Sequence, residues 1–333
     1  MSKRHLVVVT DYLAESGYEL PVLGDIADLH LLLATDEADL VRRGASADAM
    51  ITFHEIRLTE QSLGALPNCR GVVRCGVGVD NVDLQAAGRR GIVVCNVPDY
   101  GTEEVADHAI LCLLALARRL LPADQSVRAG QWHPSIVFGA PRLRRRTLGL
   151  IGCGRIGTAM ALRAKALGLR VAFYDPYKPD GFDRALGIQR CDRLSDLLMQ
   201  SEFVSLHCPL TPETYHILNA ETLAQLPVGA YIINTARGGC IDLAALLEAL
   251  DTGRVNSAAL DVIENEPLAD ERVRQHPKLL LTPHVAFYSV EGYAEMRTKA
   301  AQEVRRMLTG EPVRNPVNLP WLVDARCKVF GGI

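Results

Sequence analysis

Short apolar runs alternate with helical patterns along this chain, beginning with Leu6–Val9. A first series of runs predicts strands at Leu6–Val9, Leu29–Leu33, Ala49–Thr52, Gly71–Arg74 and Ile92–Cys95. A second series predicts strands at Leu148–Ile151, Val171–Tyr174, Phe203–His207, Tyr231–Asn234, Ala258–Val262 and Leu279–Thr282. Strands that alternate with helices are typical of parallel sheets covered by helices. The pattern therefore predicts two α/β units in succession.

Two long helical patterns flank the second series of strands. The first runs from Thr102 to Leu120, and Glu103 and Glu104 lie in its first turn, where carboxylates stabilise the positive end of a helix dipole. We expect it to be a buried helix that connects the two domains and a candidate subunit interface. The second runs from Val290 to Thr309 and carries apolar residues four positions apart. We expect it to return to the first domain.

The composition limits the function classes. With 333 residues, 48% of them hydrophobic and 23% charged, the chain can form two domains that each bury a core. The net charge of −3 creates no field that would attract nucleic acid or an anionic membrane. The longest apolar stretch, Ala109 to Ala117, is about half as long as a membrane-spanning helix. We therefore expect neither nucleic acid nor a membrane as a partner.

The nine cysteines form no CxxC pair, and most of them lie in apolar runs. A disulfide framework or a zinc site would show tighter, paired spacing. The cysteines therefore predict small, reduced core residues of a cytoplasmic protein without a metal site.

The strongest motif is Gly152-Cys153-Gly154-Arg155-Ile156-Gly157, which follows a predicted strand and opens a helix predicted from Arg155 to Leu167. In this context each glycine has a physical reason. Gly152 allows a tight turn, Gly154 lets the backbone approach a pyrophosphate at the helix N-terminus, and Gly157 lets helix and strand pack closely. The motif predicts a dinucleotide-binding site.

Asp175 ends the next predicted strand, 18 residues after Gly157. Dinucleotide sites of this kind carry an acidic residue about 20 residues after the glycines, where it binds the ribose hydroxyls. Because a carboxylate there repels a 2′-phosphate, the sequence favours NAD over NADP as the cofactor.

Three later strands are followed by residues suited to catalysis, namely Arg237, Glu266 and His284. If the strands are parallel neighbours, these side chains meet at one edge of the sheet. Reduction of a ketone needs a hydride on carbon and a proton on oxygen, and His can supply the proton near neutral pH. A carboxylate can orient the imidazole, and an arginine can bind a substrate carboxylate. Each residue alone has an ordinary structural explanation, but their joint placement favours a dehydrogenase.

Together the motifs resemble those of the NAD-dependent D-2-hydroxyacid dehydrogenase family. They are GCGRIG with Asp175, HCPLT at residues 207–211, NTARGG at 234–239, ALDVIENEP at 259–267 and TPH at 282–284. The resemblance covers nearly the whole chain and is closest to the C-terminal-binding-protein-like branch, on residues 161–168 and 173–177. It implies two Rossmann/flavodoxin-like parallel-sheet α/β domains with an active-site cleft between them. Residues 1–101 and 290–333 would bind substrate, and residues 102–289 would bind NAD.

The resemblance also implies roles for the residues that match the family's motifs. His284 would be the catalytic acid/base, Glu266 its partner and Arg237 the arginine that orients the substrate. The substrate-binding positions would be His54, Arg74, Val77 and Gly78, the last two through their backbone N–H groups. The cofactor-binding positions would be Thr102, Gly152, Gly154, Arg155, Ile156, Gly157, Asp175, Cys208, Pro209, Thr214, Thr235, Ala236, Asp261 and His284.

The resemblance implies a homodimer that interconverts a small 2-keto acid and a D-2-hydroxy acid. One position departs from the close branch, which carries a tryptophan three residues after the catalytic His, where this chain has Phe287. The substrate preference of that branch therefore does not transfer.

The short segment after Val290 disfavours a phosphoglycerate dehydrogenase. An NAD(H)-sensing, corepressor-like binding module on the same fold stays open as the alternative, and the sequence does not name the substrate.

Overall fold

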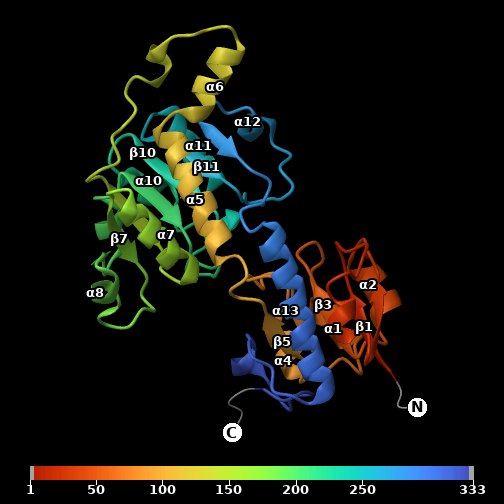
Figure 1. Ribbon diagram of the computed structural model, residues 1–333. Coiled ribbons are helices and arrows are strands. Elements are labelled where there is room, and N and C mark those ends of the chain that lie inside the picture. The colour runs from red at the N-terminus through yellow and green to blue at the C-terminus, as the bar shows by residue number, and fades with distance from the viewer. Residues whose placement is uncertain (1–3, 330–333) are drawn as a thin grey trace. The chain divides into compact units, whose positions relative to one another are not determined.

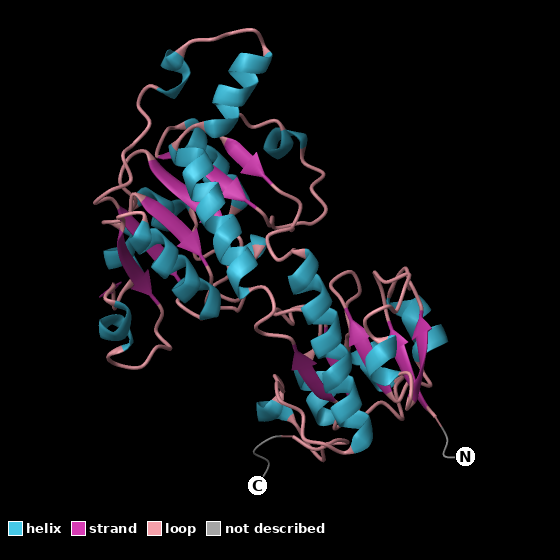
Figure 2. Cartoon of the chain, in the orientation of Figure 1, coloured by secondary structure: helices cyan, strands magenta, loops and turns pink. Residues whose placement is uncertain are grey.

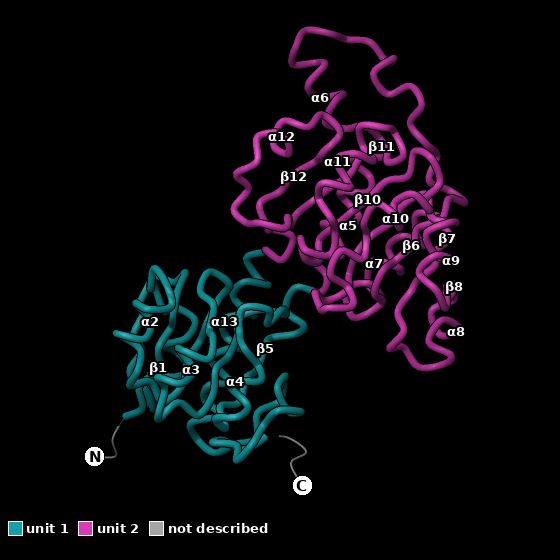
Figure 3. Tube along the Cα trace, turned by 180° about the vertical axis from the view of Figure 1, so that it is seen from behind, with its two compact units in different colours: residues 1–101, 289–333 teal, residues 102–288 magenta. Residues whose placement is uncertain are grey.

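The computed structural model describes residues 4–329, so the outermost residues of the predicted first domain, 1–3 and 330–333, lie outside it. The chain folds into two compact units, one of residues 1–101 and 289–333 and one of residues 102–288 (Figure 3). Each unit contains one parallel sheet with helices around it (Figure 2). Two parallel-sheet α/β units are the fold class that the alternating pattern predicts.

The larger unit contains a seven-stranded sheet in the order β12-β11-β10-β9-β6-β7-β8. The strands β6 and β10 are buried at every residue, because helices cover both faces of the sheet. The strands are β6 (Thr147–Ile151), β7 (Arg170–Tyr174), β8 (Gln189–Arg190), β9 (Phe203–Leu206), β10 (Ala230–Asn234), β11 (Val255–Leu260) and β12 (Leu279–Leu281).

The helices of this unit form two layers. On one face α5 and α7 pack against each other and against the sheet (Figure 1), and on the other face the core includes α9, α10 and α11. The helices are α5 (Thr102–Ala117), α6 (Leu120–Arg128), α7 (Arg155–Ala166), α8 (Phe182–Leu186), α9 (Leu194–Leu198), α10 (Ala220–Ala224), α11 (Leu243–Asp251) and α12 (Glu271–Arg274), with short 3-10 turns η1 (Pro134–Val137) and η2 (Gly238–Cys240).

The strand order of the larger unit changes direction at β6, which has β7 on one side and β9 on the other. In open parallel sheets, ligands bind beyond the carboxyl ends of the strands at such a switch point. The glycine motif follows β6, so the fold places it where a ligand is expected.

The smaller unit contains a five-stranded sheet in the order β2-β1-β3-β4-β5. The last long helix, α13, packs on β3 and β4 and beside α1, so the end of the chain returns to the first unit. The elements are β1 (His5–Val9), α1 (Leu20–Leu23), β2 (Ala27–Leu31), α2 (Glu37–Gly44), β3 (Ala49–Thr52), α3 (Glu60–Gly64), β4 (Gly71–Arg74), α4 (Leu84–Arg89), β5 (Val93–Asn96), α13 (Val290–Thr309) and η3 (Leu319–Trp321).

A buried ion pair joins α13 to the N-terminal part of this unit. Arg297 donates from Nε to Glu19 Oε1 at 2.7 Å, and both side chains are almost completely buried. Removing one partner of a buried ion pair strongly destabilises the fold, because the other charge is then buried without a counter-charge. The pair therefore fixes where the returning helix docks.

The structure corrects the helix predicted over Thr102–Leu120. α5 ends at Ala117, Arg119 adopts a left-handed φ of +53°, and α6 begins at Leu120. The short strand β8 was not predicted, because Gln189–Arg190 carries no apolar pattern. The predicted strand at Leu29–Leu33 lies two residues earlier, at Ala27–Leu31.

Candidate active site

The glycine motif forms the turn between β6 and α7. Gly152 has a φ of +87°, and a Cβ there would lie 2.7 Å from the backbone N of Cys208. A Cβ on Gly157 would lie 2.4 Å from the carbonyl oxygen of Gly152, so helix and turn pack as closely as glycine allows. Neither position accepts a side chain without movement of the backbone.

Gly154 differs from these two glycines, because a Cβ there would meet no atom within 4 Å. It is the N-cap residue of α7, whose first N–H groups have no partner within the helix. Arg155 and Ile156 form the first turn of that helix. The open space over Gly154 and the helix N-terminus fit the pyrophosphate of a dinucleotide, since both favour a negative group close to the backbone.

The carboxylate of Asp175 is fixed beside this turn. Its Oδ2 accepts a hydrogen bond from the backbone N of Cys153 at 2.9 Å, and its Oδ1 accepts one from Tyr177 at 3.1 Å. Because β7 is the neighbour of β6, the end of β7 brings Asp175 to the edge of the glycine turn. This placement fits a carboxylate that binds the ribose of the same dinucleotide.

The loop after β9 lies on the other side of the glycine turn. Cys208 is 7% exposed, and its Sγ lies 4.0 Å from that of Cys240. Thr214 donates from Oγ1 to the carbonyl of Pro209 at 2.6 Å and accepts from the backbone N of Thr211, which closes the loop. These contacts place the backbone of Cys208 against Gly152 and give Thr214 a structural role.

His207 begins this loop and lies largely in the protein interior. Its Nε2 is 2.9 Å from Ser205 Oγ, and its buried Nδ1 makes no hydrogen bond to any described residue. Burial lowers the pKa of His207 from 6.5 to about 4. The imidazole is therefore neutral at neutral pH.

The turn after β10 carries Arg237. Asn234, the last residue of β10, donates from Nδ2 to the carbonyl of Arg237 at 2.9 Å and accepts from the backbone N of Ala236 at 3.0 Å. The guanidinium of Arg237 donates from Nη1 to the carbonyl of Ala236 at 2.7 Å. Thr235 is 9% exposed, and its Oγ1 makes no hydrogen bond within residues 4–329. A buried hydroxyl of this kind fits a position that faces a polar ligand.

Glu266 and His284 meet beyond the ends of β11 and β12. Glu266 Oε2 lies 2.8 Å from His284 Nδ1, so the carboxylate holds one ring nitrogen and the other, Nε2, can exchange a proton. His284 adopts a left-handed φ of +54°, which is uncommon for a residue with a side chain. Such strain persists only where the surrounding structure fixes it, and it is concentrated at functional sites.

Asp261 provides that surrounding structure. Its carboxylate is 3% exposed and accepts hydrogen bonds from Thr282 Oγ1 at 2.6 Å and from the backbone N of Val285 and of Ala286, both at 3.0 Å. Its own carbonyl accepts from the backbone N of His284 at 2.8 Å. Asp261 was assigned to the cofactor by resemblance, and in the structure its side chain is fully engaged in holding the turn that carries His284.

Phe287 supplies an aromatic side chain next to this turn. Its ring centroid lies 6.3 Å from that of His284, with the two planes at 80°. The edge-on arrangement is one that aromatic pairs prefer. The residue that departs from the close branch therefore lies beside His284, the predicted acid/base.

The residues predicted to bind substrate lie at the carboxyl edge of the smaller sheet. Arg74 ends β4, and Cys75 donates its backbone N–H to Thr52 at the end of β3, which precedes the His54 loop. The carboxylate of Asp11 accepts from the backbone N of Phe53 and of Glu55, both at 2.9 Å, and fixes that loop. The structure thus brings His54 and Arg74 to neighbouring strand ends. Their assignment to the substrate, with that of Val77 and Gly78, stays a prediction.

Two features are absent from the described part of the chain. Residues 4–329 contain no cluster of three or more His, Cys, Asp or Glu side chains that could hold a metal ion. Within the same residues, no helix has both the length and the apolar character that crossing a membrane requires. All nine cysteines are described; none is in a disulfide, and all except Cys327 are buried.

Comparison with known protein families decides the assignment. The family model described as "D-isomer specific 2-hydroxyacid dehydrogenase, NAD binding domain" matches residues 110–286. This chain belongs to that family. The matched segment contains the glycine turn, Asp175, Arg237, Glu266 and His284, and the cofactor of the site is therefore a nicotinamide dinucleotide.

Several members of the family are similar to this chain over most of its length. A D-3-phosphoglycerate dehydrogenase of Synechocystis sp. is 36% identical over 316 residues, which are 95% of this chain and 56% of that protein. The chain thus spans little more than half the length of that curated relative. An NADPH-dependent glyoxylate/hydroxypyruvate reductase of Sinorhizobium meliloti, solved with NADP and malonate, is 30% identical, with a TM-score of 0.86 over 99% of this chain and 100% of that one.

A second similar structure is a protein of Thermus thermophilus. It is 35% identical, with a TM-score of 0.84 over 94% of this chain and 99% of that chain. The finer likeness to the C-terminal-binding-protein-like branch has no counterpart among these family members and stays a prediction.

Three residues that shape this dehydrogenase site were given no role from the sequence. Asn234 holds the backbone of Arg237, and Thr282 donates to Asp261. His108, on α5, has its Nε2 3.1 Å from Thr282 Oγ1. The positions of Asn234 and Thr282 at the ends of predicted strands were the available signal, whereas His108 lies in an apolar helix and gave none. Thr102, predicted to contact the cofactor, is the first residue of α5.

Proposed function

We propose that this chain interconverts a 2-keto acid and a D-2-hydroxy acid with NAD(H). The observation that carries the proposal is the 2.8 Å contact between His284 Nδ1 and Glu266 Oε2 beyond the ends of two adjacent strands. This acid/base pair lies on the same sheet edge as the glycine turn, in the segment that matches the family model.

The chemistry divides between the cofactor and the protein. The bound nicotinamide supplies or accepts the hydride at the substrate carbon. In the reductive direction His284 donates a proton from Nε2 to the carbonyl oxygen, and in the oxidative direction it accepts that proton. Glu266 fixes the ring and stabilises its charged form through Nδ1. The planar guanidinium of Arg237 orients the keto acid by hydrogen bonds to its carboxylate and carbonyl.

The substrate is a small 2-keto acid in this proposal. The similar proteins are named for glyoxylate, hydroxypyruvate and D-3-phosphoglycerate, all compounds with a carboxylate. We assign the carboxylate to the backbone N–H groups of Val77 and Gly78, with His54 and Arg74 beside it. The position of the Arg74 side chain is restricted, because its Nη1 donates a hydrogen bond to the carbonyl of Cys75 at 3.1 Å.

NAD is the proposed form of the cofactor, although the Sinorhizobium relative is named for NADPH. The support comes from Asp175, whose carboxylate is already held at the glycine turn by two backbone N–H groups. A 2′-phosphate placed there would meet a fixed negative charge.

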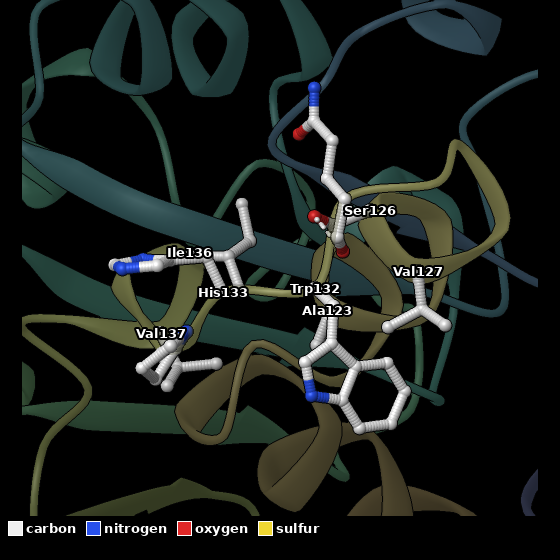
Figure 4. A pocket seen from close by; sticks show the side chains of 9 residues that line it. Ala123, Ser126, Val127, Trp132, His133, Ile136 and Val137 are labelled. Atoms are coloured by element: carbon white, nitrogen blue, oxygen red, sulfur yellow. Dashed lines mark hydrogen bonds between the residues drawn. The ribbon is translucent and has the colours of Figure 1, made fainter.

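We also propose a homodimer, with an interface different from the one expected on the sequence. Much of α5 is buried against the sheet and α7, so it offers little free surface. The exposed apolar side chains gather instead on α6 and the following turn η1, which extend from the body of the unit (Figure 1). Trp132 is 87% exposed and Phe138 66%, and Trp132 lines a hollow with Val127 and Ile136 (Figure 4). A second copy of this chain is the occupant that would cover these side chains.

A cytoplasmic location is the last part of the proposal. The nine cysteines, none of them in a disulfide, support it, because thiols persist in a reducing compartment.

The experiment that tests the activity measures oxidation of NADH by the purified protein with glyoxylate, hydroxypyruvate, phenylpyruvate and a branched keto acid, each repeated with NADPH. Turnover with at least one keto acid, and a faster rate with NADH, is expected. Binding of NADH without turnover of any keto acid would replace the proposal by the cofactor-sensing module.

A further inference from the structure

A second histidine–carboxylate pair lies next to the loops that follow β10 and β11. It takes no part in the proposed acid/base chemistry. His216 Nε2 is 2.6 Å from Glu264 Oε1, and about a quarter of each side chain is exposed. Glu264 stands two residues before Glu266 in the loop that follows β11. Tyr215 stacks on the His216 ring at a centroid distance of 3.9 Å and donates from its hydroxyl to the same Glu264 oxygen at 3.3 Å.

His216 also contacts the loop that carries Arg237, through its backbone. Its N–H donates to the carbonyl of Gly239 at 2.9 Å, and two residues later Leu218 donates to Cys240 at 3.1 Å. His216 therefore binds the turn after β10 with its main chain and the loop after β11 with its side chain. One residue thus connects the segment of Arg237 to the segment of Glu266.

The two loops also touch each other at this place. A Cβ on Gly238 would lie 1.9 Å from the carbonyl carbon of Ile263 and 2.4 Å from the backbone N of Glu264. The next residue, Gly239, faces Tyr215, whose Cδ2 would be 3.6 Å from a Cβ there. The loops are in backbone contact where the His216–Glu264 pair holds them, so a shift of one loop would displace the other.

The backbone of His216 has an unusual conformation, which allows the residue to contact both loops. Its φ is +49°, a left-handed conformation that is uncommon for a residue with a Cβ. The left-handed turn directs the N–H to one loop while the ring reaches the other. Strain of this kind is retained at functional sites, where the surrounding contacts determine it.

We propose that His216, through Glu264, is a positioning residue that sets the spacing between Arg237 and Glu266 for the proposed reaction. The guanidinium has to bind the substrate while Glu266 holds His284, so the two groups must keep a fixed separation. Neither His216 nor Glu264 exchanges a proton with the substrate in this assignment. The inference rests on the proposed function for its effect on turnover, whereas the coupling of the two loops can be measured without any reaction.

The test compares three variants and a control. His216→Asn removes the contact with Glu264 and keeps the left-handed backbone, which Asn tolerates well. His216→Gln keeps a side-chain N–H donor that reaches Glu264. His276→Asn is the matched control, because His276 Nε2 lies 3.2 Å from Asp251 Oδ1 in the same unit and forms the same kind of pair away from these loops. The double variant His216→Asn/Glu264→Ala tests whether the two side chains act as one unit.

The expected result for His216→Asn is a kcat about tenfold lower with the dissociation constant of NADH unchanged, because misplacement of catalytic groups affects the reaction more than cofactor binding. His216→Gln restores most of the rate, and the double variant loses no more activity than His216→Asn. Hydrogen–deuterium exchange rises in residues 236–241 and 262–267 together for His216→Asn, and in neither segment for His276→Asn.

Two outcomes would overturn the inference. One is a kcat for His216→Asn equal to that of the control, and the other is an exchange rate that rises in only one of the two loops or in neither. If the wild-type protein turns over none of the keto acids, the proposed function fails, and the exchange measurement still decides whether His216 couples the loops.

Discussion

Two histidines near the proposed site have unusual backbone conformations. His284 and His216 both have left-handed backbones although each carries a large side chain, and each makes a histidine–carboxylate contact. The sequence predicts His284 and Glu266 because each follows a predicted strand. It could not predict His216 or Asp261 as supports, because a contact made through backbone conformation and burial leaves no pattern in the sequence.

His207 makes the stability of the folded protein sensitive to acid. Burial lowers its pKa from 6.5 to about 4, so the unfolded chain binds a proton on this ring at a higher pH than the folded chain does. The stability associated with neutral His207 is therefore present above pH 6.5 and is lost as the pH falls toward 4. We expect His207→Asn to reduce the loss of unfolding free energy between pH 7 and about pH 5, as measured by urea denaturation.

His133→Asn is the control for this prediction, because His133 lies exposed before η1. It should leave the pH dependence as it is in the wild type. An identical loss of stability in wild type and His207→Asn would show that His207 does not contribute to acid sensitivity.

At the scale of elements, the apolar runs located the strands of both sheets because buried parallel strands consist of little else. The failures have physical causes. The apolar pattern continues past Ala117, but the left-handed conformation at Arg119 ends α5 and redirects the chain into α6. β8 pairs only through Ala172 and Phe173 of β7, a contact set by the neighbouring strand and not by its own side chains.

The turn between β6 and α7 gives a prediction at this scale. Gly154 has a φ of −73° and open space where a Cβ would be, so Gly154→Ala should fold with only a small loss of melting temperature, from the weaker N-cap of α7. The added methyl group would occupy the space assigned to the pyrophosphate. We expect the affinity for NADH, measured by fluorescence titration, to fall about tenfold or more, since backbone approach to the phosphates requires glycine.

Gly17→Ala provides the matched control, because a Cβ at Gly17 also meets no atom within 4 Å. It should change neither property. If Gly154→Ala bound NADH as tightly as the wild type, the cofactor would not lie against this turn.

At the scale of the whole molecule, two structural features bring together residues that are far apart in the sequence. The segment after Ser289 belongs to the first unit, and the Arg297–Glu19 pair explains why. The three proposed catalytic residues are far apart in sequence and reach one edge because β10, β11 and β12 are parallel neighbours. Parallel pairing could be predicted from the alternating pattern, whereas the exposed arm of α6 and η1 depends on the break at Arg119 and could not.

The exposed arm leads to a prediction about assembly. Replacing Trp132 and Phe138 by serine removes the two most exposed aromatic side chains of this segment, and the variant should be monomeric by light scattering at a concentration where the wild type is dimeric. Val228→Ser is the control, because Val228 is 77% exposed on the same unit but outside the arm. A wild-type monomer, or a dimer that survives the double change, would contradict the proposed interface.

The most direct test of the account is the rate of NADH oxidation by His284→Asn relative to wild type, with a keto acid that the wild type reduces and with both proteins saturated with NADH. Asn suits the left-handed backbone at this position and cannot donate the proton in place of the imidazole. The expected kcat is lower by about 10²–10⁴-fold with NADH affinity preserved, the range expected for loss of a general acid. A variant that turns over at the wild-type rate would contradict the assignment of His284 and, with it, the proposed mechanism.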